Sequence, residues 1–373
     1  MPRAAQGRRW QPPAEVPVWV PHGEAAHDEL VRVLGDIRKG VYIDGPSMPL
    51  SALLERWLKH MKNRVSARSY ARYREIVTLY INPRLGATPL DKLRGSAIQA
   101  VYDELLVNGR TRGSGGLSSR SVQYVHRTLH SAMQFALRQE FVGRNPCVSA
   151  QAPSVIRREF QALDEAGLIK LVDTARDTPF QGFIFLAGMS GLRRNELLAL
   201  SWASVDWTAG TISVHRSMEK SPSGELSFKS PKTDRSRRLV ALPSLAMDVL
   251  KSVKVKQAAQ KLALGPDFRN DHDLVFTDGF GAPLNPDTVS KSFSRLVRGL
   301  GYPKLRLHDL RHTAATLMLR QGVHAKIVSE MLGHSSVALT LDTYSHVAPT
   351  MQESAAAKMD AALRSAMRKA QGG

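Results

Sequence analysis

The chain has 373 residues, a length that suits two compact domains, each with a hydrophobic core of its own. Its 52 lysines and arginines against 33 aspartates and glutamates give a formal net charge of +19, which favours a polyanionic partner, nucleic acid ahead of an anionic membrane surface. The one cysteine, Cys147, excludes an intramolecular disulfide and a CxxC zinc site and fits a reducing cytoplasm, and no apolar stretch is long enough to span a bilayer.

Residues 1–46 are expected to form an N-terminal arm. Prolines are frequent up to about residue 21, which is typical of irregular chain. Residues 24–39 then carry leucine, valine and isoleucine at three- to four-residue spacing. This spacing predicts one helix, which Gly40 ends.

Residues 47–143 are predicted to form a small all-helical domain. The spacing of apolar residues indicates four helices, over residues 50–58, 66–81, 96–107 and 119–140. A flexible glycine-rich loop is expected at residues 113–116. Arginines decorate the second helix, and we interpret them as contacts to DNA; the alternative is a solvated charge coat on an ordinary bundle.

Residues 144–160 are polar, basic and interrupted by prolines, a composition typical of an interdomain linker. The next helix is predicted to start at Asp164 and to run to about Ala175. Residues 161–350 are then expected to form a second, mostly helical domain, followed by a helical tail at residues 351–373.

One part of the second domain, residues 204–242, changes character. Residues 211–214 alternate between apolar and polar, and residues 238–243 indicate another strand. A turn signal lies at residues 221–224. Helices resume after residue 244, so the sequence predicts a small β-sheet inserted in a helical domain.

The segment from Leu307 to Thr313 opens a helix with two basic residues on one face, His308 and Arg311. A helix N-terminus that presents an arginine and a histidine favours phosphate, because its free N–H groups also attract anions. Two other interpretations exist: Asp309 caps the helix above solvated basic residues, or His308 and His312 form a zinc pair. The zinc interpretation lacks a glutamate next to the first histidine.

A second motif surrounds Gly191, where the chain turns tightly into a helix. Arg193 is expected in the first turn of that helix, where it can pair with Glu196 three residues later. Taken alone, this arrangement is typical of a structural ion pair. Lys232 lies farther along, in a dense basic turn between two strand signals.

The last motif begins at Gly333, which is expected to stop a helix just before His334. Tyr344 follows ten residues later. A tyrosine in such a position is, taken alone, typical of a half-buried packing residue.

The order of these motifs resembles that of the tyrosine recombinases of the phage integrase type. The segments GLRRNELLAL, PKTDRSRRLVALP, HDLRHTAATLML and LGHSSVALTLDTYSH fit that family in register, within residues 47–350. The resemblance implies a mainly α fold, with a helical core-binding domain and a mostly helical catalytic domain that carries a small sheet, together clamping DNA. It also implies a set of catalytic residues: Arg193, Lys232, His308, Arg311, His334 and Tyr344.

By this resemblance, the two arginines would hold the phosphodiester and offset the charge of its transition state. The tyrosine would attack it and form a 3′-phosphotyrosine bond. His308 would accept the phenol proton, Lys232 would protonate the leaving 5′-oxygen, and His334 would hydrogen-bond the phosphate. We expect neither a metal nor another cofactor.

The expected function is therefore site-specific recombination that integrates or excises a mobile element. Two alternatives use the same scaffold, a type IB topoisomerase-like DNA-relaxing enzyme and a non-catalytic DNA-binding regulator; a metal-dependent nuclease is a third. The expected partners are double-stranded DNA, further copies of the chain (a tetramer in the synaptic complex) and an accessory DNA-bending or directionality protein. No membrane is expected.

Two parts of the chain depart from the family pattern or extend beyond it. Residues 24–43 resemble the closing helix of the three-stranded domain with which many integrases bind arm sites, but the segment before them is too short and proline-rich for the complete domain. We therefore interpret residues 1–46 as a possible remnant of it, left either by truncation or by degeneration. Residues 354–370 predict an amphipathic helix. In the family such a helix docks on a neighbouring protomer, and packing within the same protomer is the alternative.

Overall fold

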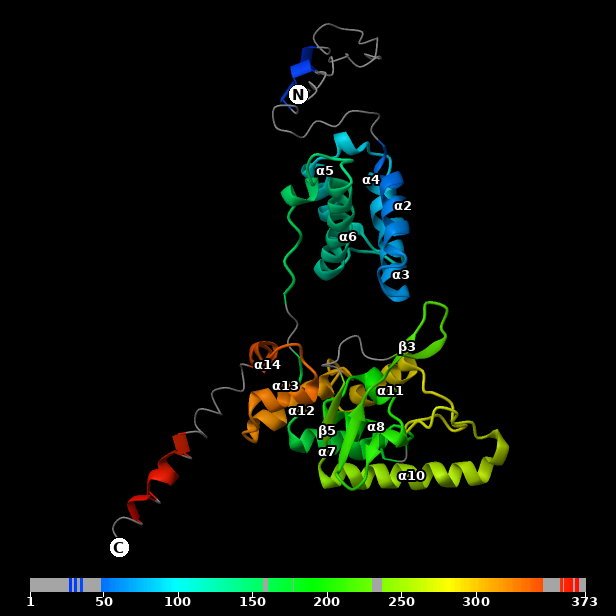
Figure 1. Ribbon diagram of the computed structural model, residues 1–373, viewed down its shortest axis with the longest axis vertical. Helices are drawn as coiled ribbons and strands as arrows, with labels where there is room; N and C mark the ends of the chain where they lie inside the picture. Colours follow the sequence, from blue (N-terminus) through cyan, green and yellow to red (C-terminus); the bar gives the residue numbers. More distant parts are fainter. Residues whose placement is uncertain are drawn as a thin grey trace, which may run out of the picture. The chain divides into compact units, whose positions relative to one another are not determined.

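A computed structural model describes residues 48–156, 160–176, 178–229 and 237–344, with short helical pieces among residues 27–35 and 356–368 (Figure 1). The chain divides into two compact units, residues 1–156 and 157–373. The division falls inside the segment whose composition is that of a linker. Most of the helix predicted over residues 24–39, and much of the C-terminal tail, lie outside the described residues.

The N-terminal unit is a helical bundle. Its α-helices are α2 (Leu50–Met61), α3 (Ala67–Ile76), α4 (Asn82–Leu85), α5 (Gly95–Asn108) and α6 (Ser119–Arg138), with short 3-10 turns η2 (Leu90–Lys92) and η3 (Pro146–Ser149). A π-helical stretch, η1 (Val77–Ile81), joins α3 to α4, so the predicted second helix changes its hydrogen-bond pattern near its end. The predicted helices are confirmed, and only their ends differ by a few residues.

The core of this unit follows the apolar spacing of its helices. Leu50, Leu53, Leu54 and Trp57 form the buried face of α2. Ser66 and Ser118 start α3 and α6 by accepting hydrogen bonds from backbone N–H groups three residues later. Two arginines of α3, Arg68 and Arg74, are exposed outside this core, and so is Arg64, which precedes the helix.

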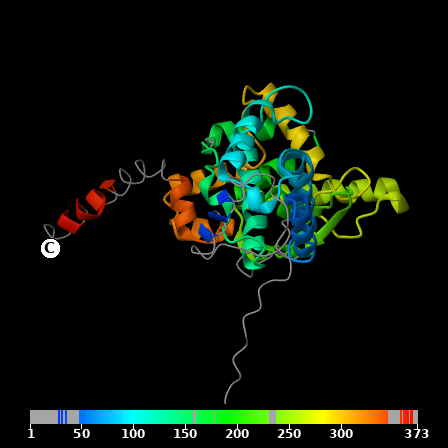
Figure 2. The ribbon, with the colours of Figure 1, turned by 90° about the horizontal axis from the view of Figure 1, so that it is seen from above.

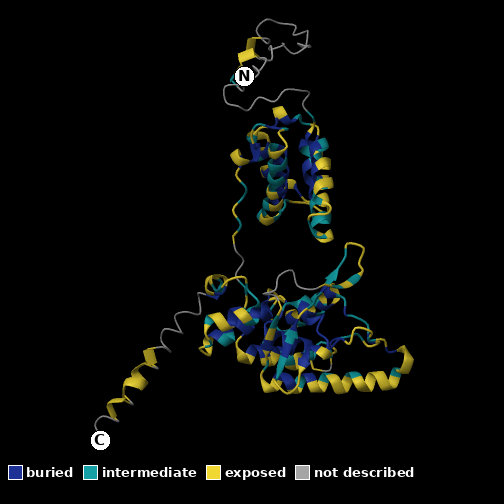
Figure 3. Ribbon diagram, in the orientation of Figure 1, coloured by how far each residue is buried: buried dark blue, intermediate teal, exposed yellow. Residues whose placement is uncertain are grey.

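The C-terminal unit is built around one apolar helix, α8 (Gln181–Ser190), which is dark blue in Figure 3. Because it is apolar on nearly every side, it is buried, and it packs most extensively against three other helices. These are α7 (Glu165–Thr174), α10 (Ser244–Leu264) and α12 (Asp309–Arg320). The remaining helices are α9 (Arg194–Leu197), α11 (Pro286–Gly299), α13 (Ala325–Leu332) and α14 (Val337–Tyr344), with 3-10 turns η4 (Trp202–Ser204) and η6 (Gly265–Asp267).

The strands of this unit form two small sheets, whereas the sequence indicated one. The first is antiparallel, in the order β1 (Val205–Asp206), β2 (Thr211–Val214) and β5 (Arg238–Ala241). The second is a separate hairpin of β3 (Ser217–Lys220) and β4 (Leu226–Lys229). Ile212 faces Val240 in the first sheet, and both are buried, so this sheet packs on the core while the hairpin is mostly half-exposed.

Helix α10 is longer than its contact with the core. Figures 1 and 2 both show its second half extending beyond the rest of the unit, where Val255 and Leu262 are exposed. Within the described residues, no helix is long and apolar enough to cross a membrane.

Gly191 makes the turn between α8 and α9, and we predict that a side chain there destabilises the C-terminal unit. Its φ is +64°, and an added Cβ would lie 2.5 Å from the Leu332 side chain. Gly191→Ala should lower the free energy of unfolding by roughly 1–3 kcal/mol from backbone strain, with the clash adding to this. Chemical denaturation measures the loss.

Gly279→Ala is the matched control, because an added Cβ there meets nothing within 4 Å and the backbone is not left-handed. Equal losses for the two variants would show that the Gly191 turn carries no special constraint.

Candidate active site

The turn that carries Arg193 is fixed by its own backbone. The Ser190 hydroxyl donates to the Leu186 carbonyl at 2.6 Å and accepts from the Leu192 N–H at 3.3 Å. Gly191 then takes the left-handed conformation, and Arg193 becomes the residue that caps α9. The sequence had indicated a place in the first helical turn, one position later.

Glu196 orients the Arg193 side chain. The Arg193 N–H donates to Glu196 Oε2, and its Nη1 donates to Oε1, both at 2.8 Å. Its Nη2 donates to the Gly333 carbonyl at 3.1 Å, so the guanidinium also contacts the loop that precedes His334. The predicted ion pair is therefore confirmed, and it aims Arg193 at a second predicted motif.

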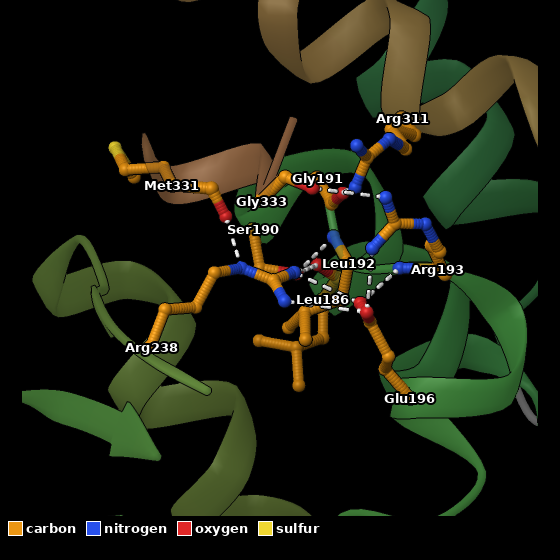
Figure 4. A network of polar contacts seen from close by, with 10 residues as sticks. All are labelled: Leu186, Ser190, Gly191, Leu192, Arg193, Glu196, Arg238, Arg311, Met331 and Gly333. Atoms are coloured by element: carbon orange, nitrogen blue, oxygen red, sulfur yellow. Dashed lines mark hydrogen bonds and ion pairs between the residues drawn. The ribbon is translucent and has the colours of Figure 1, made fainter. Parts of the chain in front are cut away.

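Glu196 is shared with a second arginine, Arg238 of β5 (Figure 4). Arg238 donates to both Glu196 oxygens, at 2.8 and 3.2 Å, and its Nε donates to the Met331 carbonyl at 2.6 Å. The side chains of Glu196 and Arg238 are only 7% and 6% exposed. Burial alone would raise the pKa of the Glu196 carboxyl, but the bonds and charges of Arg238 and Arg193 outweigh it and hold that pKa below its usual value.

Arg311, on the first turn of α12, is the buried cation of the site. It is 4% exposed, and its Nη1 donates to the Gly191 carbonyl at 2.9 Å. Burial, together with the charge of Arg193, lowers the pKa of Arg311 to about 9. The guanidinium remains charged at neutral pH, and a bound anion would relieve the cost of that charge.

His308 caps α12 one turn before Arg311. Burial and the Arg311 charge lower the pKa of His308. Its neighbour Asp309 is 1% exposed and accepts from Arg306, with a side-chain bond of 2.7 Å. Asp309 thus binds the turn before the helix, and no group of three or more potential metal ligands occurs among the described residues.

His334 follows Gly333, which ends α13 with a left-handed φ of 65°, as the sequence predicted. Its Nδ1 lies 2.7 Å from the Thr340 hydroxyl. Burial and the charges of Arg311 and Arg193 lower the pKa of His334 to about 4. The ring is therefore neutral at pH 7.

Tyr344 ends α14 and is 3% exposed. Its Oη lies 3.0 Å from Nδ1 of His312, the residue after Arg311. Burial raises the pKa of Tyr344 to about 12, although the Arg311 charge acts in the opposite direction. The ring of Phe160 stacks on His312 and meets Tyr344 edge-on, with centroid separations of 4.2 and 5.6 Å.

The structure thus describes five of the six predicted residues within the C-terminal unit. The contacts given above join Arg193 to the loop of His334 and Arg311 to the Gly191 turn, and the Arg311 charge reaches both His334 and Tyr344. Lys232 lies in residues 230–236, outside the described part of the chain.

Three neighbours of the site escaped the sequence argument. His312 was considered only as a zinc ligand, although its position next to Arg311 was a usable signal. Arg238 was visible only as a strand residue. Phe160 gave no signal, because its contacts are with residues remote in sequence.

Comparison with known proteins identifies the family of this chain. A family model described as the phage integrase family matches residues 161–351, more than half of the chain. The chain belongs to the phage integrase family. A second model, the phage integrase N-terminal SAM-like domain, matches residues 50–106 of the helical unit.

Individual relatives agree with this membership. A tyrosine recombinase XerC-like protein of Caldanaerobacter subterraneus is 27% identical over 341 residues, 86% of this chain and 85% of that protein. An integrase of Streptomyces ambofaciens is 28% identical over 344 residues, 88% and 84%. The chain is thus an enzyme of the tyrosine-type site-specific recombinases.

Solved structures share the fold. The Tn1549 transposon integrase in complex with transposon right end DNA matches with a TM-score of 0.69 at 20% identity, over 84% of this chain and 99% of that one. The lambda integrase tetramer bound to a Holliday junction matches with a TM-score of 0.59 at 18% identity, over 87% and 88%. The mainly α fold class implied by the motifs is confirmed.

The buried Glu196–Arg238 pair leads to a stability prediction. Arg238→Met leaves the Glu196 carboxylate buried beside Arg193 alone, and this should cost roughly 3–5 kcal/mol of unfolding free energy. Adding Glu196→Gln removes the stranded charge and should restore at least about half of the loss. Chemical denaturation of the wild type, of Arg238→Met, of Glu196→Gln and of the double variant measures it. Additive losses in the double variant would contradict the coupling.

The low pKa values of His312 and His334 lead to a pH prediction. Histidine in the unfolded chain has a pKa near 6.5, so the unfolded state binds more protons between that pH and the folded values of about 4. The stability due to these neutral rings is therefore complete above about pH 6.5 and is lost as the pH falls.

The melting temperature should fall between about pH 7.5 and about pH 5, and it should fall less in a His312→Gln, His334→Gln double variant. Parallel curves for the two proteins would show that neither ring is held neutral by the fold.

Proposed function

We propose that the chain cuts and rejoins DNA at specific sites, and integrates or excises a mobile element, through a covalent bond to Tyr344. One observation carries the proposal: a buried arginine, an oriented arginine and a neutral histidine lie within electrostatic reach of one another, and the charge of the buried one also reaches a tyrosine hydroxyl. Such a pocket suits a phosphodiester, which is an anion that gains charge when it is attacked.

Arg193 and Arg311 would bind the non-bridging oxygens of the phosphodiester. Guanidinium groups donate paired hydrogen bonds to phosphate, and they remain charged throughout the reaction. Because Arg311 is buried and its charge is costly without an anion, its attraction for the phosphate exceeds that of a solvated arginine. His334, being neutral, would donate a hydrogen bond to phosphate without adding charge.

Tyr344 Oη would then attack phosphorus, and the bond from phosphorus to the 5′-oxygen would break. The phenol proton passes to His308, which is neutral before the step. The leaving 5′-oxygen takes a proton from Lys232. The 3′-phosphotyrosine bond conserves the phosphodiester, so a 5′-hydroxyl of a second DNA duplex can reverse the reaction and rejoin the strands without ATP.

Double-stranded DNA is the proposed partner. The net charge of +19 and the exposed arginines of α3 supply a backbone contact that should weaken steeply with salt. The Tn1549 integrase structure contains transposon end DNA, and the lambda integrase structure is a tetramer on a Holliday junction. We propose the same arrangement here, a homo-oligomer that is a tetramer during synapsis, with an accessory DNA-bending or directionality protein.

Removal of the phenol hydroxyl tests the nucleophile. Tyr344→Phe should form no covalent adduct on a nicked suicide substrate, whereas the wild type accumulates one, and DNA affinity should change less than about twofold because one buried hydroxyl adds little to a backbone-dominated interface. Denaturing gel electrophoresis separates adduct from free DNA. An adduct of equal yield in the variant would overturn the assignment of Tyr344.

The products distinguish the other functions. A substrate with two cognate sites should yield recombinant joints, and adduct formation should persist in EDTA. Relaxation without recombinant product would favour a topoisomerase, and activity abolished by EDTA would favour a metal-dependent nuclease. Binding without any adduct would favour a regulator.

A further inference from the structure

The ring of Tyr344, the proposed nucleophile, contacts two other aromatic rings, those of Phe160 and His312. His312 and Phe160 stack almost in parallel, with an interplanar angle of 14° and a centroid separation of 4.2 Å. His312 Nδ1 lies 3.0 Å from Tyr344 Oη. Neither His312 nor Phe160 belongs to the set of residues that the motifs assigned to the reaction.

The position of the His312 ring is determined from several sides. It projects from α12, one residue after Arg311, and the ring of His308 meets it edge-on at 5.3 Å. Phe160 is held against the same helix, because the N–H of nearby Leu163 donates to the Thr313 hydroxyl at 3.0 Å inside the core. A ring fixed in this way keeps its hydrogen-bonding nitrogen at one place.

Burial and the groups around the His312 ring keep it neutral. Burial, His308, Arg311 and Arg306 lower the pKa of His312 to about 4, and Asp309 opposes them. A neutral imidazole carries one proton, and the neighbour of Nδ1 decides whether that nitrogen donates or accepts.

Burial makes the Tyr344 hydroxyl, which faces His312 Nδ1, hard to ionise. Burial raises the pKa of Tyr344 to about 12, so formation of a phenolate there is more costly than in water. The Arg311 charge offsets part of this cost, but both arginines are also needed by the phosphate. A hydrogen-bond donor aimed at Oη would stabilise the charge where it develops.

We propose that His312 is a further catalytic residue, whose Nδ1–H donates to Tyr344 Oη and stabilises the phenolate while the phenol proton leaves to His308, and that Phe160 positions its ring. This inference rests on the proposed function. In this tautomer His312 neither gains nor loses a proton. It fixes the oxygen, and it leaves the hydroxyl hydrogen free to move to the base.

The test compares two replacements of His312 in single-turnover cleavage of a nicked suicide substrate. His312→Phe keeps an aromatic ring to stack on Phe160 but has no donor. His312→Asn loses the stack but places an amide N–H near the original Nδ1. We expect the cleavage rate to fall about 10²-fold in the first variant, as on removal of an oxyanion donor, and to recover at least about tenfold in the second.

A residue with only a packing role would give the opposite order, since phenylalanine preserves the stack and asparagine does not. The pH dependence adds a second measurement. Without the donor, the phenol is harder to ionise, so the alkaline rise of the cleavage rate should move to higher pH in His312→Phe. A purely structural defect would lower the rate equally at every pH.

Phe160→Leu tests the positioning role, with Phe160→Tyr as its matched control. Leucine keeps apolar contact but lets the His312 ring turn, and we expect about a tenfold loss of rate, whereas tyrosine should stay close to wild type. Circular dichroism and DNA binding verify that each variant is folded. If His312→Phe does not fold, the two Phe160 variants still test whether the position of the His312 ring matters for cleavage.

The outcomes distinguish failure of the proposed function from failure of the proposed role of His312. If the wild type forms no adduct that depends on Tyr344, the proposed function fails. If that adduct forms and His312→Phe cleaves at the wild-type rate, or faster, only the role of His312 fails, and a faster rate would identify the contact as inhibitory.

Discussion

The buried carboxylate of Glu196 is the constraint on which the active site depends. It accepts hydrogen bonds from Arg193 and Arg238, and Arg238 also donates to a backbone carbonyl in the last turn of α13. Removing such charges from water costs several kcal/mol for each ion, and only a complete set of hydrogen bonds offsets that cost. Glu196 and its two arginines can therefore adopt few arrangements. The arrangement in Figure 4 holds together strand β5, the α9 turn and the Gly333 loop.

This rigid cluster determines the electrostatics of the pocket. Burial and the charges of Arg193 and Arg238 lower the pKa of Arg311, and burial together with nearby positive charge lowers the pKa values of His312 and His334 to about 4. Positive charge is thus concentrated on the arginines, which stay charged at neutral pH, and the histidines remain available as neutral donors or acceptors. Under the proposed function, a phosphodiester would gain hydrogen bonds from fixed donors, which do not have to reorganise as charge develops.

Sequence reasoning succeeded where a local pattern determines the structure. The glycine turns at 191 and 333 and the pairing of Arg193 with Glu196 follow from neighbours within a few residues. It failed where distant segments meet. Alternation showed strands but not that β3 and β4 pair only with each other, and no local rule links Phe160 or Arg238 to the site. The motif order supplied what the local patterns lacked, because it reflects a whole fold.

The burial of Tyr344 shows what these constraints achieve together. Tyr344, the proposed nucleophile, is 3% exposed, and with a pKa raised to about 12 it is almost entirely protonated at neutral pH. The hydroxyl is therefore unreactive in the structure as it stands. Under the proposed function, attack would require the phosphate to reach Oη and the local charge to favour the phenolate, and both would depend on DNA bound against the arginines. A recombinase would benefit from such coupling, because its reactivity would then appear only where its substrate is held.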